Sequence, residues 1–317
     1  MSGAAPARAG IDAVKAPRRV RLGAILNPAS GRRDMRRVVE AVAEHVERQG
    51  GHLDIRHTER AGHATSIAEE LADSAEALLI AGGDGTVAEA INGLRGRHVP
   101  LAIIPTGTEN LLARELSMPR DPMRMAGLLS RGSAVIRDLA EANGRLFAST
   151  LGVGFDAECV RRLSRVRRGH ISYLTYVRPI LSTFLFHRFP RLRVEVDGAE
   201  VFDDCGFVIM GVISRYAAGL RIAARARHDD GLCDVIAFPC RTRRRLLAHA
   251  ARALAGRHLG GAGVVYRQFR SAKITGESET PIQIDGDAVG ELPISVESRP
   301  SSVCYLVEPT EYLPGGA

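Results

Sequence analysis

The segment at residues 77–94 constrains most strongly what this chain can fold into. A short apolar run ends in Gly82-Gly83-Asp84-Gly85-Thr86, and apolar residues then recur at helical spacing. This order predicts a strand, a glycine loop and a helix. Glycine lets the backbone approach a bulky anion, and a helix N-terminus attracts negative charge. The segment therefore predicts a phosphate-binding loop.

The acidic residue in this loop needs its own explanation, because a carboxylate repels phosphate. Asp84 would meet a phosphate most readily through Mg²⁺, which takes oxygen ligands. A tight turn in which the Asp caps the helix is the simpler alternative. Two adjacent glycines, an Asp and another Gly at one strand end favour the phosphate loop.

The first half of the chain alternates strands and helices. Strands are expected at residues 20–26, 52–58, 77–81, 100–104 and 133–139, and helices at 34–49, 62–72, 87–94, 111–116 and 122–131. This alternation predicts a parallel sheet with helices on both faces. Ligands of such sheets bind at the carboxyl ends of the strands. The loops after Leu26, Ala81 and Ile104 are therefore expected to converge on one crevice.

The second half is expected to be mostly antiparallel β. Strands at 192–196 and 201–212 are joined by Asp197-Gly198, a strong hairpin signal. Further strands are expected at 232–238, 263–267, 271–275, 281–284, 292–296 and 302–307, with one further long helix at 243–255. The boundary between the halves falls near residues 138–145. The 317 residues are enough for two domains.

Composition indicates a reduced, cytosolic protein. The five cysteines are scattered without a CxxC pair, and no uncharged apolar stretch is long enough for a membrane span. Residues 1–18 lack the apolar core of a secretory signal and are expected to be a disordered leader. The net charge of +7 rests almost entirely on arginine. We interpret this as compositional bias and expect no nucleic-acid partner.

One glycine motif resembles a dinucleotide site. Gly152-Val153-Gly154-Phe155-Asp156-Ala157 matches GxGxxA, but that fold needs an acid about 20 residues further on, and residues 159–194 contain none. We interpret the motif as a glycine turn with another role.

The acid-free stretch has a composition of its own. It contains nine arginines, namely Arg161, Arg162, Arg165, Arg167, Arg168, Arg178, Arg188, Arg191 and Arg193. Within it, residues 171–186 are apolar at helical spacing. Arginines beside an apolar, aromatic helix suit an anionic membrane surface, so residues 161–189 are a candidate membrane contact. A helix that packs between domains, with a solvated basic face, is an equal alternative.

Several motifs in order resemble the diacylglycerol kinase catalytic domain family, which includes bacterial lipid kinases and the sphingosine and ceramide kinases. The matching residues are Asn27 to Gly31, Gly82 to Thr86 with Glu89 and Asn92-Gly93, Pro105 to Asn110 with Ala113-Arg114, Asp138, Gly152 to Ala157, Tyr216 to Leu220, Asp229 to Leu232 and Ile284 to Asp287. Each motif is weak alone, whereas their order and spacing are specific.

The resemblance implies a doubly wound α/β nucleotide domain of the NAD kinase and diacylglycerol kinase type at 19–140. An antiparallel β-sandwich domain for the lipid substrate follows at 141–304, and a tail at 305–317 can return to the first domain. The implied reaction transfers the γ-phosphate of ATP, with Mg²⁺, to a hydroxyl of diacylglycerol or a related long-chain lipid. The expected setting is cytoplasmic and peripheral to the inner face of the membrane, and a homodimer is compatible with it.

The resemblance also implies roles for single residues. Asp285 is the implied general base, Asp84 reaches the catalytic Mg²⁺, and Asp138 supports the metal network. Asp230 and the carbonyl of Leu232 match a structural Mg²⁺ site. The residues implied to bind nucleotide or phosphate are Asn27, Ser30, Gly31, Thr58, Gly82, Gly83, Gly85, Thr86, Gly107, Thr108 and Asn110.

The chain departs from the family pattern on the lipid side. The family usually has Asn near Val212 and three glycines where this chain has Ala217-Ala218-Gly219, and Glu109 and Leu111 are variants of their loop. Asp287 stands where a Glu is common. Two alternatives therefore stay open beside the lipid kinase: a lipid-binding pseudokinase, and a kinase of a soluble acceptor such as NAD.

Overall fold

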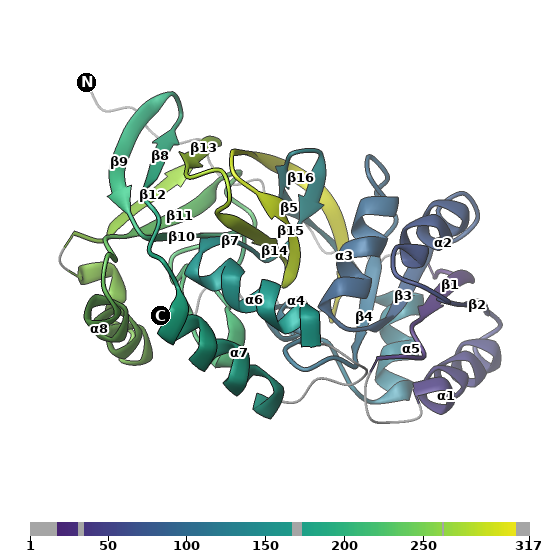
Figure 1. Cartoon of the computed structure of the whole chain (residues 1–317). Helices are drawn as coiled ribbons and strands as arrows, with labels where there is room; N and C mark the ends of the chain where they lie inside the picture. Colours follow the sequence, from purple (N-terminus) through teal and green to yellow (C-terminus); the bar gives the residue numbers. More distant parts are fainter. Residues whose placement is uncertain (1–17, 31–34, 167–172, 262, 309–317) are drawn as a thin grey trace, which may run out of the picture.

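The computed structural model describes residues 18–30, 35–166, 173–261 and 263–308. Its first half alternates strands and helices as predicted (Figure 1). The elements are β1 Arg21–Leu26, α1 Met35–Arg48, β2 His52–His57, α2 His63–Leu71, β3 Ala77–Gly82, α3 Asp84–Gly93, β4 Leu101–Pro105, α4 Leu111–Glu115, α5 Pro122–Arg131 and β5 Ser133–Ala142. Residues 1–17 of the predicted leader at 1–18 lie outside the described residues. Gly31, a predicted nucleotide-binding residue, also lies outside them.

The strands β2, β1, β3 and β4 lie side by side in that order and run parallel. Leu26 pairs with Ala81, and Gly82 pairs with Pro105. The three strands therefore end at the same level, and the loops that follow them meet at one edge of the sheet.

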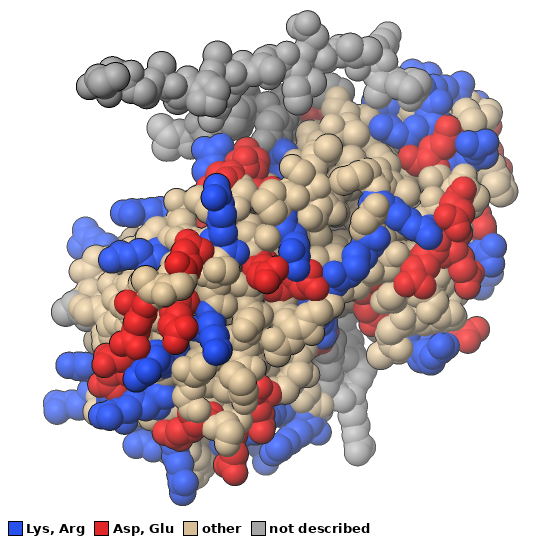
Figure 2. Space-filling model, turned by 90° about the horizontal axis from the view of Figure 1, so that it is seen from above, with Lys and Arg blue, Asp and Glu red and all other residues tan. Residues whose placement is uncertain are grey.

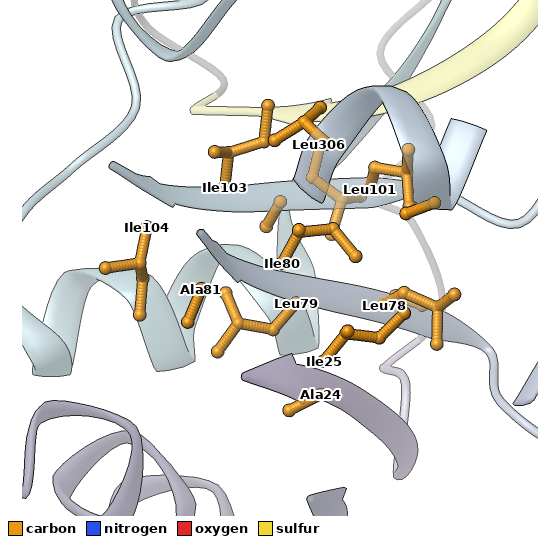
Figure 3. Close-up of a cluster of buried hydrophobic side chains, with 14 of the residues drawn as sticks. Ala24, Ile25, Leu78, Leu79, Ile80, Ala81, Leu101, Ile103, Ile104 and Leu306 are labelled. Atoms are coloured by element: carbon orange, nitrogen blue, oxygen red, sulfur yellow. The ribbon is translucent and has the colours of Figure 1, made fainter. Parts of the chain in front are cut away.

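The centre of this sheet is buried because helices cover both of its faces. Every residue of β3 is buried. Figure 3 shows this core, in which Ile25, Ile80 and Ile103 pair across the strands on one face of the sheet and Leu79 points to the other face. A central parallel strand of this kind has no polar face, which explains the continuous apolar run in its sequence.

The second half forms the predicted β-sandwich with added helices. Its elements are β6 Arg145–Phe147, β7 Thr150–Gly154, α6 Phe155–Val166, α7 Tyr173–Phe186, β8 Leu192–Val196, β9 Ala199–Cys205, β10 Phe207–Gly211, the 3₁₀ turn Ala217–Gly219, β11 Cys233–Phe238, α8 Arg243–Leu254, the 3₁₀ turn His258–Gly260, β12 Val265–Phe269, β13 Ser271–Gly276, β14 Pro281–Ile284, β15 Asp287–Glu291 and β16 Ile294–Val307. A sheet in the order β12-β11-β10-β7-β14-β15 packs against the end of the first sheet.

One sheet runs through both halves of the molecule. β16 pairs with β13 near its start, with β5 along most of its length, and through Tyr305 with Leu101 of β4. The end of the described chain thus returns to the nucleotide half. Because β16 belongs to both halves, they share a continuous set of backbone hydrogen bonds.

Three expectations for the second half were wrong. The strand expected at 201–212 is two strands in different sheets, divided at Gly206, where a Cβ would lie 1.7 Å from the carbonyl oxygen of Cys240. The strands expected at 292–296 and 302–307 are the single strand β16, with an irregular register between Arg299 and Val303. Helix α6 was not predicted, because Gly152 to Ala157 was interpreted as a turn.

We predict that Gly93→Ala destabilises the α/β half. A Cβ at Gly93 would lie 2.2 Å from the carbonyl oxygen of Thr65 in α2, so α2 and α3 would have to separate. We expect the free energy of unfolding in urea to fall by on the order of 2 kcal/mol. The matched control is Gly127→Ala in α5, where a Cβ meets nothing within 4 Å. It should raise stability by about 0.5–1 kcal/mol, and equal effects of the two variants would contradict the packing argument.

Candidate active site

The loops that follow β1, β3 and β4 are tied together by short polar contacts. The side-chain amide of Asn27 donates to the hydroxyl of Thr86 at 2.9 Å. The hydroxyls of Ser30 and Thr106 lie 2.5 Å apart, and the backbone N–H of Thr106 donates to Gly82 at 3.1 Å. Thr58, which follows β2, is buried and donates its N–H to Leu26. The structure therefore brings the three predicted loops together, with Thr58 beside them.

The loops after β3 and β4 require glycine because they approach each other closely, apart from any requirement of a ligand. A Cβ on Gly107 would lie 2.9 Å from the Cα of Gly83, and a Cβ on Gly82 would lie 2.5 Å from Thr86. The loops after β3 and β4 could not approach one another with larger residues. A Cβ on Gly85 meets nothing within 4 Å, so this position faces open space at the start of α3.

The Asp84 carboxylate lies at the N-termini of two helices. It is the first residue of α3, and its two oxygens accept the backbone N–H groups of Asn110 and Leu111 at 2.8 and 2.7 Å, where α4 begins. Burial, with a smaller effect from the charges of Asp285 and Glu109, raises the pKa of Asp84 to about 6, although the two N–H donors oppose the rise. The variant residue Leu111 contributes through its backbone, so its side chain can differ.

Asn110 fixes the shape of the loop after β4. Its backbone is left-handed, with a φ of 50°, and its side chain both accepts from the N–H of Gly107 and donates to the carbonyl of Gly107. Asn tolerates this conformation better than most residues. Thr108 lies in the chain between Gly107 and Asn110, within the loop that their two hydrogen bonds close. Asn110 therefore directs its own N–H toward Asp84.

The second half contributes Asp285, which is held by a nest of donors. Its carboxylate accepts the N–H groups of Ala148, Ser149 and Thr150 at 3.0–3.1 Å and the Ser149 hydroxyl at 2.5 Å. Burial raises the pKa of Asp285, although these donors oppose the shift. The charge of Asp285 in turn raises the pKa of Asp84, so the two carboxylates influence each other electrostatically across the junction of the halves.

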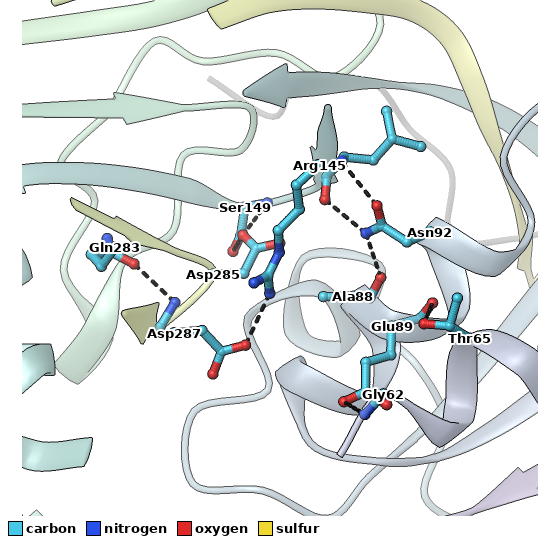
Figure 4. A network of polar contacts seen from close by, with 12 residues as sticks. Gly62, Thr65, Ala88, Glu89, Asn92, Arg145, Ser149, Gln283, Asp285 and Asp287 are labelled. Carbon is cyan, nitrogen blue, oxygen red and sulfur yellow. Dashed lines mark hydrogen bonds and ion pairs between the residues drawn. The ribbon is translucent and has the colours of Figure 1, made fainter. Parts of the chain in front are cut away.

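Figure 4 shows the polar contacts that fix this junction. The side chain of Asn92 accepts from the N–H of Leu146 at 3.0 Å and donates to its carbonyl at 2.9 Å, which ties α3 to β6. Glu89 accepts the N–H groups of Gly62 and Ala64 at the start of α2. These two residues of the sequence motif therefore position α3 rather than a ligand.

Asp138 and Asp230 lie in a different group from Asp84. Asp138 accepts the N–H groups of Gly231 and Ser301, and so connects β5 to the loop before β11 and to β16. Asp230 accepts from the N–H of Leu232 at 3.0 Å and from the Gln268 side chain at 3.1 Å. Since both oxygens of each carboxylate already have protein donors, this group braces a loop in the structure.

The sequence analysis missed a buried network behind the Asp285 turn. Asp156 accepts from the Tyr216 hydroxyl through one oxygen and from the Gln283 amide at 2.8 Å through the other. Gln283 in turn accepts the N–H of Gly286 at 2.9 Å. The Gly152 to Ala157 motif, which resembled a dinucleotide site, thus links the loop at Tyr216 to the turn that holds Asp285, the candidate base. The sequence signal that could have revealed this network was an acidic residue, Asp156, between the apolar residues Phe155 and Ala157.

Two departures from the family pattern touch each other. The carboxylate of Glu109 accepts the N–H of Ala218 at 3.1 Å, and Ala218 has a left-handed backbone with a φ of 57°. The second oxygen of Glu109 is buried and has no hydrogen-bond partner within the described part of the chain. The 217–219 turn of the second half is therefore held against the loop after β4.

The residues fit a magnesium ion that is bound mainly by water and phosphate. No three His, Cys, Asp or Glu side chains among the described residues are close enough to enclose a metal. Mg²⁺ commonly uses one or two carboxylates and keeps several waters. Asp84, whose pKa is raised chiefly by burial, and the Glu109 oxygen that has no hydrogen-bond partner among the described residues meet that requirement.

Two family models match the chain. The model described as diacylglycerol kinase catalytic domain matches residues 21–142, and the model described as YegS C-terminal NAD kinase beta sandwich-like domain matches residues 149–307. The chain belongs to the diacylglycerol kinase family. This membership confirms the predicted enzyme class, a phosphotransferase with an alcohol group as acceptor.

Relatives agree over most of the chain at modest identity. A diacylglycerol kinase of Staphylococcus carnosus is 26% identical over 87% of this chain and 91% of that protein. A diacylglycerol kinase of Bacillus subtilis is 27% identical over 85% and 90%. A crystal structure of a diacylglycerol kinase from Bacillus anthracis superposes with a TM-score of 0.74 at 24% identity, and covers 92% of this chain and 98% of that one. This likeness confirms the predicted fold.

We predict that Asp84 makes the stability of the ligand-free protein depend on pH. Its pKa is about 6 in the fold against an ordinary 3.8, so between about pH 4 and 6 the folded state binds the proton more tightly than the unfolded chain. Stability from this group is therefore lost as pH rises through that window, by up to about 3 kcal/mol. Urea unfolding of wild type and Asp84→Asn from pH 4.5 to 7 should diverge accordingly, and parallel profiles would contradict the shift.

We also predict that Gln283→Leu weakens the Asp285 turn. The change leaves the Asp156 carboxylate and the Gly286 N–H without their buried partner, at a cost on the order of 2–4 kcal/mol in unfolding free energy. The matched control is Gln268→Leu, a strand Gln that is exposed and donates to Asp230. It should cost less than about 1 kcal/mol. Equal losses for the two variants would rule out a special role for the network.

Proposed function

We propose that this protein is an ATP- and Mg²⁺-dependent lipid kinase. It transfers the γ-phosphate of ATP to a hydroxyl of diacylglycerol or a related long-chain lipid. The observation that carries the proposal is the position of the buried Asp84 carboxylate at two helix N-termini, where it accepts the N–H groups of Asn110 and Leu111. A carboxylate with a raised pKa on a phosphate-binding loop suits the binding of a divalent cation that is itself bound to a nucleotide.

The nucleotide side of the site supplies position and charge. Phosphoryl transfer depends mainly on alignment and on neutralising the phosphate oxygens. The open approach at Gly85 and the N-terminus of α3 suit the phosphates, with Asn27, Ser30 and Thr86 beside them. Mg²⁺, when bound, would neutralise phosphate charge there. Asp84 would hold the ion directly or through its waters.

The Asp285 turn supplies the proton acceptor for the lipid hydroxyl. The family resemblance assigns this role to Asp285, and burial raises its pKa in the sense that a base requires. Its oxygens already accept four hydrogen bonds, however, which restricts their access to a substrate. Asp287, two residues further, has a side chain that is 41% exposed and pairs with Arg145. Asp287 is therefore the second candidate for the base.

Diacylglycerol is the proposed acceptor because the relatives that match most of this chain carry that name. Its product would be phosphatidate, an intermediate of phospholipid biosynthesis. Because ATP is a cytosolic reactant, we place the reaction at the cytoplasmic face of the membrane. The contact between Glu109 and Ala218 supports an active enzyme over a pseudokinase, since two residues that depart from the pattern complement each other.

A radiolabelled-ATP assay tests the proposal. Purified protein would receive mixed micelles with diacylglycerol, monoacylglycerol, phosphatidylglycerol, ceramide or sphingosine, and NAD without lipid as the soluble acceptor. We expect labelled phosphatidate from the wild type and at least a hundredfold loss of activity in Asp84→Asn. Labelled product from NAD alone would establish the soluble acceptor, and ATP binding without any product would establish the pseudokinase.

Two further variants identify the base. Loss of at least a hundredfold in kcat is expected for the variant that removes it, Asp285→Asn or Asp287→Asn. The matched control is Asp73→Asn, which changes a carboxylate with a 78% exposed side chain in a surface ion pair and should retain wild-type activity. Unfolding curves of each variant separate lost chemistry from lost structure. Full activity of both Asp285→Asn and Asp287→Asn would show that the base does not lie in this turn.

A further inference from the structure

Between Val177 and Phe186, helix α7 carries apolar residues on both its covered and its uncovered side. Arg178 is the only charged residue between Tyr173 and Phe186. Pro179, Thr183 and His187 recur at one side and are buried. A surface helix normally carries polar residues on the opposite face. In α7 that face is apolar as well.

The uncovered side of α7 concentrates exposed apolar surface. The exposed fractions are 57% for Val177, 46% for Ile180, 55% for Leu181, 48% for Leu185 and 70% for Phe186. Three of them recur every four residues, which places them in one row along the helix. Other exposed large apolar residues of the nucleotide half, such as Met123 and Ile136, lie on separate elements. A contiguous apolar row marks an interaction surface.

Helix α8 extends this surface. The Arg243 guanidinium donates to the carbonyls of Phe184 and Leu185 at 2.9 and 2.5 Å, so the start of α8 lies against the end of α7 (Figure 1). Leu247, one turn after Arg243, is 57% exposed. We call Val177, Ile180, Leu181, Leu185, Phe186 and Leu247 the α7–α8 face.

The two helices of this face carry arginine and no acidic residue. Arg178, Arg188 and Arg244 are exposed, and within the described part of the chain none of them is seen paired with a carboxylate. Residues 159–194 contain no acid. By contrast, Figure 2 shows Lys and Arg interspersed with Asp and Glu on the face of the molecule seen from above. A membrane with anionic lipids complements an apolar row edged by arginine.

We propose that the α7–α8 face docks on the surface of an anionic membrane. The inference rests on the proposed lipid kinase function and names the surface from which the substrate is taken. A second copy of the chain fits less well, because it would bring the same arginines together. No helix in the described ranges is long and apolar enough to cross a bilayer, so contact along the surface is the arrangement proposed.

The position of the face suits access to the site. α6 packs against α7 on one side and against β14 and β15 on the other, and these two strands flank the Asp285 turn. The buried ring of His187 stacks edge-on against Phe155 at the start of α6. With α7 docked on the membrane, α6 and the strands β14 and β15 form a continuous packed connection between the membrane surface and Asp285, the candidate base.

Vesicle flotation without ATP tests the docking independently of catalysis. Wild type is expected to bind vesicles that contain phosphatidylglycerol better than pure phosphatidylcholine vesicles, and to be released by salt. Leu181→Asp should lower the partition coefficient at least tenfold. Arg188→Gln should lower it about fivefold at low salt. The matched control is Met123→Asp on α5, which is 62% exposed and should bind like wild type.

Activity on two substrates separates this proposal from the kinase itself. Leu181→Asp should phosphorylate water-soluble dioctanoylglycerol like wild type and lose at least tenfold in rate on long-chain diacylglycerol in vesicles. Wild type that fails to bind anionic vesicles, or Leu181→Asp that binds them normally, would overturn the docking. A dimer in sedimentation that Leu181→Asp dissociates, without vesicle binding, would assign the face to a second copy. Failure of the wild type on dioctanoylglycerol would concern the kinase proposal alone.

Discussion

The bond between the Asp84 carboxylate and the first N–H groups of α4 is the constraint on which the site depends. Asp84 begins α3 and its oxygens accept from Asn110 and Leu111, so one side chain holds the loop after β3 against the loop after β4. Both loops can meet there because Gly83 and Gly107 have no side chains. The protein thereby keeps a carboxylate whose charge is disfavoured by burial and by its neighbours. Sites that bind cations commonly hold such destabilised groups.

The two halves of the molecule are joined by backbone as well as by side chains. β16 pairs with strands of both halves, and Asn92 fixes α3 to β6. Asp285 is held by the N–H groups that lead into β7. Because these contacts surround the site, Asp84 and Asp285 keep their relation without a ligand. A pre-organised junction of this kind suits a reaction that depends on alignment.

The residues that depart from the family pattern have physical explanations in the structure. Leu111 acts on Asp84 through its N–H, and Glu109 accepts from Ala218. The exposed apolar row of α7 is also explained by the packing of its helix. Its opposite side is anchored by Pro179 and Thr183, so the row is presented outward by a helix that is fixed in place.

Local sequence patterns were enough to predict the fold class and the loops of the nucleotide half. Strand and helix periodicities are local, and parallel strands must end at one edge, so Gly82 to Thr86 and Asn110 were predicted to meet. Only the tertiary structure decided what depends on contacts between distant residues. Gly206 divides a predicted strand because Cys240 lies against it, the Asp285 carboxylate accepts N–H groups of residues 148–150, and Asp138 accepts the N–H of Gly231. Such contacts join residues that no local pattern relates, and their partners become known only when the chain is folded.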